Sequence, residues 1–241
     1  MLEYRMIDDC KTVYVSILTV GGATADEVIQ RWAQPADRTY ASKHRLAAGE
    51  RRSLLARALL RDLLQHTSNL TGSEWEIGND TRGRPWVSHP CLRQGVTVSI
   101  THSGAYVAVA ATRLGTIGID IERHETARRF SEIAETAFGP SFAYLDEAVP
   151  FYRLWCLREA TGKAIGEGLA SVLDLEELTH DTPAVGAWCR RDASGQWLLA
   201  HLEPIPGYSL GIGVLPRNGV PLAGWSLESL SWHRLPDKAA G

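Results

Sequence analysis

Residues 116–122 read TIGIDIE, and this stretch decides the fold because isoleucine alternates with glycine or an acid. A period of two predicts a β-strand, in which alternate side chains share a face. Asp120 and Glu122 are therefore expected side by side, on the face opposite the isoleucines. The apolar content indicates a buried strand, where two carboxylates repel each other unless a cation or proton lies between them. The alternative is a solvated edge strand with two surface acids.

Residues 151–161 read FYRLWCLREAT and predict a helix that begins after Pro150 and ends near Gly166 and Gly168. Glu159 lies at the edge of its apolar stripe, and Lys163 follows one turn later. Hard oxygen ligands suit Mg²⁺, which proteins commonly share with phosphates. Three carboxylates and one amine therefore indicate a magnesium site for a pyrophosphate. The alternative is a Glu–Lys surface pair on an exposed helix face.

The remaining pattern predicts a second set of similar elements. Strands are expected at 11–20, 96–101, 106–112, 197–202 and 208–215, helices at 24–34, 37–47 and 50–64, and a turn at 102–104. The sequence GYSLGIGV at 207–214 echoes GAYVAVAA at 104–111, although a chance likeness is the alternative. The predicted fold is α+β, with two pseudo-symmetric subdomains, each an antiparallel sheet packed on helices. The expected lobes are 1–114 and 115–241, with the active site at their interface.

Composition excludes several classes of function. The net charge of −3 gives no basic stripe for nucleic acid, and no apolar run approaches the ~20 residues that cross a membrane. No signal-peptide layout surrounds the first residues, so a cytoplasmic protein is expected, by default a monomer. The four cysteines form no CxxC pair, which argues against a zinc site or a disulfide framework.

Three further segments carry candidate anion-binding groups. His102 lies in STHS, whose hydroxyls suit an anion-binding turn, although a histidine in a turn is more often structural. Arg84 lies in a stiff Gly-Arg-Pro loop, where the alternative is ordinary loop charge. Arg51 and Arg52 lie near a helix start, where the macrodipole disfavours cations unless a phosphate is bound.

Four motifs in this order resemble the Sfp-type 4′-phosphopantetheinyl transferases. They are GRP at 83–85, SITHS at 99–103, GIDIE at 118–122 and WCLREA at 155–160. The family's two-lobed form agrees with the suspected duplication. The chain departs from the family at Arg84 and Arg158, where lysine is common, and at Thr101, where serine is common. Arginine keeps the charge but presents a planar fork, so the phosphate geometry differs.

The resemblance implies a role for each matched residue. Asp120, Glu122 and Glu159 would bind Mg²⁺, and Glu159 would also act as general base for the accepting serine. Lys163 would neutralise the pyrophosphate and assist the leaving group. The remaining residues would hold or surround the phosphates of coenzyme A: Arg45 as a weaker candidate, Arg52, Arg84, His102, Ser103 and Arg158.

The implied reaction moves the 4′-phosphopantetheine arm of coenzyme A onto a serine of an apo acyl or peptidyl carrier protein, with Mg²⁺, and releases 3′,5′-ADP. Carrier proteins of this kind are acidic around that serine. Residues 123–149 are therefore expected to dock them, through Arg123, Arg128, Arg129, Phe130 and Phe138. The alternatives are a Mg²⁺-dependent nucleotide hydrolase and a non-catalytic binder of coenzyme A or carrier protein. Fatty acid, polyketide, nonribosomal peptide and siderophore synthesis all remain open as pathways.

Overall fold

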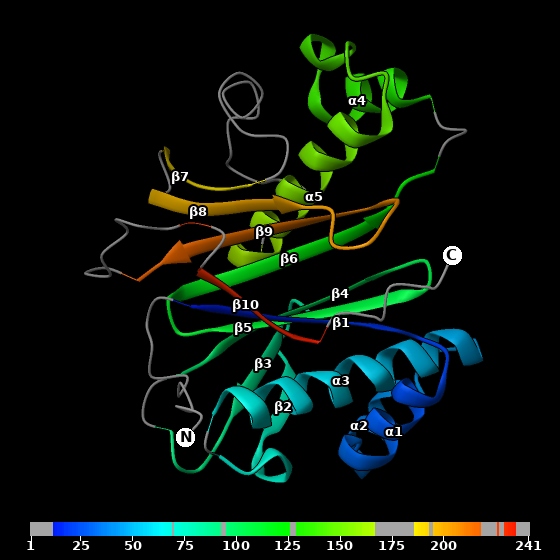
Figure 1. The fold of residues 1–241 in the computed structure, drawn as a ribbon, viewed down its shortest axis with the longest axis vertical. Helices are drawn as coiled ribbons and strands as arrows, with labels where there is room; N and C mark the ends of the chain where they lie inside the picture. The colour runs from blue at the N-terminus through cyan, green and yellow to red at the C-terminus, as the bar shows by residue number, and fades with distance from the viewer. Residues whose placement is uncertain are drawn as a thin grey trace.

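The computed structural model describes residues 12–68, 70–92, 95–125, 129–166, 186–192, 195–217, 226 and 229–234. Two four-stranded sheets lie between two groups of helices (Figure 1). None of the helices within these ranges is long and apolar enough to cross a membrane.

The first half of the chain forms one sheet, a hairpin and three α-helices. Its elements are β1 (Val13–Thr19), α1 (Ala23–Trp32), α2 (Pro35–Ala41), α3 (Ala47–Thr67), the short helix η1 (Gly72–Glu74), β2 (Glu76–Asn79), β3 (Pro85–Ser88), β4 (Thr97–Ser103) and β5 (Tyr106–Thr112). The second half contains β6 (Gly115–Arg123), α4 (Phe130–Phe138), η2 (Pro140–Phe142), α5 (Ala148–Ile165), β7 (Gly186–Asp192), β8 (Gly195–Leu202), β9 (Tyr208–Pro216) and β10 (Leu230–Arg234).

Three strands of each sheet share one order, which confirms the predicted pair of α+β subdomains. The first sheet runs β10-β1-β5-β4, and the second runs β6-β9-β8-β7. Antiparallel β1-β5-β4 therefore matches antiparallel β6-β9-β8, and the echoing segments at 104–111 and 207–214 form β5 and β9. Strand β10 comes from the second half of the chain but pairs parallel with β1. The division after residue 114 stays a proposal.

The molecule has four layers, two of helices outside and two sheets inside, with an apolar cluster between each pair of neighbouring layers. Helix α3 packs on one face of the first sheet, through residues such as Leu59 and Val109. The opposite face packs on the isoleucines of β6, so the two sheets bury Ile17 and Ile119 between them. Helices α4 and α5 cover the far side of the second sheet, where Trp197 is buried. Burial of these faces is the main stabilising contribution.

Glycines let helix α5 lie directly on the second sheet. A Cβ at Gly118 would fall well inside contact distance of the Ala160 carbonyl oxygen. A Cβ at Gly211 would lie 2.5 Å from the Cys156 carbonyl group. Gly118 of β6 and Gly211 of β9 therefore set how closely α5 packs on the sheet, and with it the position of Glu159 on α5 relative to the acids on β6.

Three sequence-based boundaries are wrong. The helix expected at 37–47 is α2 ending at Ala41, and a turn separates it from α3. The turn expected at 102–104 is shorter, because β4 continues to Ser103 and pairs it with Tyr106. Helix α5 begins at Ala148, before Pro150 rather than after it. Proline is tolerated in the first helical turn because the N–H groups there have no intrahelical acceptor, so its missing N–H costs no hydrogen bond.

Replacing Gly118 with alanine is expected to destabilise the protein by about 1–3 kcal/mol or more, because β6 and α5 must separate. The control is Gly21→Ala, where an added Cβ meets no heavy atom within 4 Å. Urea titration of both variants measures the change in the free energy of unfolding. Equal stability of the two variants would contradict the close packing of α5 on β6.

Candidate functional site

The two sheets join where their edge strands β4 and β6 meet. Hydroxyl groups at every second residue of β4 bond to the backbone of β6, and we call this set the hydroxyl row. Its members are Thr97, which donates to the Gly115 carbonyl, and Ser99, Thr101 and Ser103, which accept from the N–H groups of Ile119 at 3.0 Å, Ile121 at 3.4 Å and Arg123 at 3.1 Å. Backbone groups of β6 that lack a strand partner are thereby satisfied.

The hydroxyl row also orients the two acids of β6. Thr101 Oγ1 donates to Asp120 Oδ1 at 3.1 Å, and Ser103 Oγ donates to Glu122 Oε2 at 2.7 Å. Each hydroxyl thus accepts from one backbone N–H and donates to one carboxylate, as its single hydrogen and two lone pairs allow. Asp120 is buried, which contradicts the alternative of two acids on a solvated strand.

Lys163 ties helix α5 to both edge strands. Its Nζ lies 2.6 Å from Asp120 Oδ1 and 3.3 Å from both Thr101 Oγ1 and the Ile119 carbonyl oxygen. These contacts contradict the alternative of a simple Glu–Lys surface pair on α5. The other oxygen of Asp120, Oδ2, is buried and has no hydrogen-bond partner among the described residues. A buried carboxylate oxygen without a donor is a candidate ligand for a cation.

Glu159 lies close enough to Asp120 for their charges to interact. Burial raises the pKa of Glu159, and the negative charge of Asp120 raises it further, while Lys163 and Arg158 partly oppose the shift. Asp120, Glu122 and Glu159 are not packed into one tight cluster, because no ligand atoms of all three lie within 4.8 Å of one another. In this state, Lys163 supplies the positive charge between the acids.

A cationic group surrounds the outer end of this site. The pKa of His102 is lowered, first because the surrounding protein removes part of the water around its ring and then by the charge of Arg52. Lys163 and His44 lower the pKa of His102 further. The charges of Arg52 on α3 and Lys163 on α5 therefore both reach His102 on β4, and this cationic group would favour an anion there.

Three of the other four predicted phosphate-binding residues are engaged by protein partners, and the fourth is exposed. Arg84 pairs with Asp80 at 2.9 Å, and Ser103 is engaged by Glu122. The guanidinium of Arg158 lies 5.4 Å from the ring centroid of Phe138 and donates to the Ala137 carbonyl of α4. Arg45 is exposed between α2 and α3. The predictions for these four residues stay predictions.

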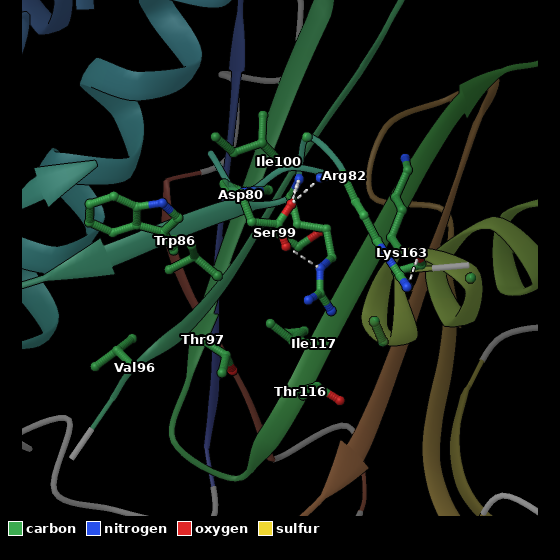
Figure 2. Close-up of a pocket in the computed structure, with 17 residues that line it drawn as sticks. Asp80, Arg82, Trp86, Val96, Thr97, Ser99, Ile100, Thr116, Ile117 and Lys163 are labelled. Carbon is green, nitrogen blue, oxygen red and sulfur yellow. Dashed lines mark hydrogen bonds and ion pairs between the residues drawn. The ribbon is translucent and has the colours of Figure 1, made fainter. Parts of the chain in front are cut away.

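A cavity of about 420 Å³ opens beside Lys163. The β2–β3 hairpin, β4, the start of β6 and the end of α5 form its walls. Figure 2 shows Asp80 and Trp86 on one side of it, Lys163 on the other, and Thr116 and Ile117 on the β6 wall. Arg84 also lines this cavity. Its volume is in the range typical of small-molecule sites.

Sequence reasoning did not predict the hydroxyl row or the Asp80–Arg84 pair. The sequence does contain a signal for the hydroxyl row, because hydroxyl residues recur at every second position of the strand: Thr97, Ser99, Thr101 and Ser103. We instead interpreted the hydroxyls near His102 as an anion-binding turn. The strand carries them to β6, where Ser103 already bonds an acid.

Two family models match successive parts of this chain. Residues 116–213 match the 4′-phosphopantetheinyl transferase superfamily, and residues 24–114 match the N-terminal region of 4′-phosphopantetheinyl transferases.

Three curated relatives are similar to the chain over half or more of their own length. The 4′-phosphopantetheinyl transferase Sfp of Bacillus subtilis is 32% identical over 168 residues, which cover 67% of this chain and 72% of Sfp. The 4′-phosphopantetheinyl transferase HetI of Nostoc sp. is 25% identical over 206 residues, covering 82% and 79%. The L-aminoadipate-semialdehyde dehydrogenase-phosphopantetheinyl transferase of Mus musculus is 27% identical over 169 residues, covering 63% and 53%.

Replacing Thr101 with valine is expected to cost about 1–3 kcal/mol of stability, because buried polar groups of Asp120 and Ile121 each lose a partner. Valine keeps the shape, so the loss measures the hydroxyl. Thr116→Val, at an exposed position of β6, serves as the control and should be near neutral. Hydrogen exchange should show faster opening of the Ile121 amide only in the Thr101 variant. Unchanged protection of that amide would contradict the junction described above.

Proposed function

This chain belongs to the 4′-phosphopantetheinyl transferase superfamily, and from that premise we propose that it transfers the 4′-phosphopantetheine arm of coenzyme A to a serine of an apo acyl or peptidyl carrier protein. The other product is 3′,5′-ADP. The observation that carries the proposal is the meeting of Asp120, Glu159 and Lys163 at the junction of the two sheets. One chain supplies every residue of this site, so we propose a monomer.

Asp120, Glu122 and Glu159 would hold Mg²⁺. The unpartnered Oδ2 of Asp120 and the raised pKa of Glu159 support this assignment, because both describe excess negative charge in a partly buried place. Carboxylate oxygens are the ligands that Mg²⁺ prefers. The bound ion would draw charge from the pyrophosphate oxygens.

The transfer exchanges one phosphorus–oxygen bond for another. The serine oxygen bonds to the β-phosphorus of coenzyme A, and the bond from that phosphorus to the bridging oxygen breaks. We assign Glu159 as the base that takes the serine proton, since its raised pKa makes it a stronger base than an ordinary glutamate. Lys163, whose side chain is 33% exposed, would neutralise the charge that develops on the departing 3′,5′-ADP.

The phosphates of coenzyme A would be held by the cationic group and by the Arg84 loop. The assignment of Arg52 and His102 is supported by their closeness, since the charges of Arg52 and Lys163 both lower the pKa of His102. Arg84 is supported by its place on the cavity wall, where Lys163 also lies. Arg45, Ser103 and Arg158 complete the proposed set on the family resemblance. The cavity has room for part of coenzyme A rather than all of it.

The carrier protein would dock on residues 123–149. Tyr144 of this segment is 57% exposed, and the Arg129 side chain is 80% exposed and pairs with Glu132 at 3.0 Å. Phe130 and Phe138 pack inward with the rings of α5. They support this surface from beneath. Arg123 lies exposed at the end of β6, while Arg128 lies outside the described residues. Arg123 and Arg129 would attract the acidic surface around the carrier serine.

Glu159→Gln is expected to abolish detectable transfer, lowering its rate by about 10²-fold or more, because the amide cannot accept the serine proton. The protein is expected to stay folded. The assay incubates apo carrier protein with coenzyme A and Mg²⁺ and weighs the carrier by mass spectrometry. Glu27→Gln on the exposed face of α1 is the matched control and should be fully active.

The same assay distinguishes the alternative functions. A nucleotide hydrolase would release a nucleotide product without adding mass to the carrier, and a binder would bind coenzyme A without changing either. Near-normal transfer by the Glu159 variant would remove the proposed base.

Reversing the charge at Arg128 and Arg129 is expected to raise KM for the carrier several-fold while leaving KM for coenzyme A nearly unchanged, because rim charges mainly steer the encounter. The control reverses two exposed arginines of the first lobe, Arg31→Glu on α1 and Arg38→Glu on α2, and so changes the charge equally. If neither KM changes in the double variant, these arginines do not contact the carrier.

A further inference from the structure

A second cluster of ligand-type side chains lies away from the carboxylates, at the far end of helix α3. Asp62 and His66 are one turn apart on α3, and His233 comes from β10. Asp62 follows Arg52 by ten residues, so about 15 Å of helix separates this cluster from the cationic group. The transfer reaction proposed above uses none of its three residues.

The three side chains converge closely. Each offers one ligand atom, and these atoms all lie within 4.8 Å of one another, which no other set of three or more such residues achieves in the described part of the chain. His233 Nε2 lies 2.8 Å from Asp62 Oδ2, and the two imidazole rings have centroids 4.2 Å apart. A metal ion with ligand bonds near 2 Å spans separations of this size.

Hydrogen bonds around the cluster determine which nitrogen of His66 can bind a metal, whereas His233 Nε2 donates to Asp62 Oδ2 and would exchange that hydrogen for the metal. His66 Nδ1 lies 2.7 Å from the Asp62 carbonyl oxygen, which can only accept, so Nδ1 carries the hydrogen. Nε2 is then the nitrogen of His66 that can offer a lone pair to a metal. An imidazole that donates its other N–H to a carbonyl or carboxylate is the usual arrangement behind a metal-bound histidine.

The Asp62 carboxylate is likewise fixed and charged. Trp32 Nε1 donates to Oδ1 at 2.8 Å, and Arg234 Nε donates to Oδ2 at 2.6 Å. The two oxygens keep further lone pairs for a cation, because a carboxylate accepts about four bonds.

The cluster is open on one side. The Asp62 side chain is 1% exposed and that of His233 is 14% exposed, while that of His66 is 44% exposed. An ion can therefore approach past His66 and keep a water molecule as a further ligand. The site therefore has a buried carboxylate, Asp62, at its floor and an exposed imidazole, His66, at its entrance.

We propose that Asp62, His66 and His233 form a binding site for a divalent transition metal of the zinc class. Two imidazoles and one carboxylate suit Zn²⁺, Ni²⁺ or Co²⁺ better than Mg²⁺, which takes oxygen ligands. The site needs no cysteine, so the wide spacing of the cysteines did not reveal it. Bound metal fastens β10, from the end of the chain, to helix α3 of the first lobe.

The test titrates Zn²⁺ into the full-length protein by calorimetry, after metal removal, without a polyhistidine tag and with excess Mg²⁺ to occupy the carboxylate site. The wild type is expected to bind one equivalent. His66→Gln and His233→Gln should each weaken that binding by about 10–100-fold or more. The control His44→Gln, which removes an exposed histidine elsewhere, should bind as the wild type does. Co²⁺ in place of Zn²⁺ should give the visible absorption of a nitrogen-ligated ion.

Two outcomes overturn the proposal. One is a wild type that binds no equivalent of Zn²⁺, and the other is a His66→Gln protein that binds it as tightly as the wild type. His66 lies at the exposed rim of the cluster, so this variant should fold, which circular dichroism checks. Zn²⁺ should also raise the Tm of the wild type and not that of His66→Gln, because only a ligand of the folded state stabilises it.

Discussion

The hydroxyl row between β4 and β6 is the interaction on which the rest of the molecule depends. Two edge strands meet there, and edge strands leave backbone groups unpaired. Side-chain hydroxyls satisfy the β6 amides of Ile119, Ile121 and Arg123. Because side chains stand between the two backbones, the sheets do not merge into one and can pack face to face. The same hydroxyls orient Asp120 and Glu122, so the junction of the lobes and the candidate site are one structure.

Charge balance explains how this junction tolerates buried acids. Lys163 contacts Asp120 and Thr101 of the hydroxyl row, and burial together with the charge of Asp120 raises the pKa of Glu159. A cation would neutralise the negative charge of the carboxylates Asp120 and Glu159, and a phosphorylated ligand would neutralise the positive charge of Lys163. Gly118 has no side chain, so α5 packs directly on β6 and places Glu159 and Lys163 close to Asp120.

Local patterns predicted the parts of the fold that have a local cause. The alternation in TIGIDIE located β6, and the repeated strand pair located β5 and β9. The sequence did not predict contacts between distant segments, such as the pairing of β10 with β1 or the meeting of Asp62 with His233, 171 positions later. Such contacts leave no period in the sequence. Within the site, the carboxylates and Lys163 followed from motif spacing, whereas the partners of Arg158 depended on where α4 packs.

A crystal of the protein with coenzyme A and Mn²⁺ in place of Mg²⁺ tests the account most directly, because anomalous scattering locates the ion without a model of its ligands. We expect an anomalous peak among the oxygens of Asp120, Glu122 and Glu159, next to the pyrophosphate of coenzyme A. Coenzyme A bound elsewhere, or bound at the junction with no ion at these three carboxylates, would contradict it.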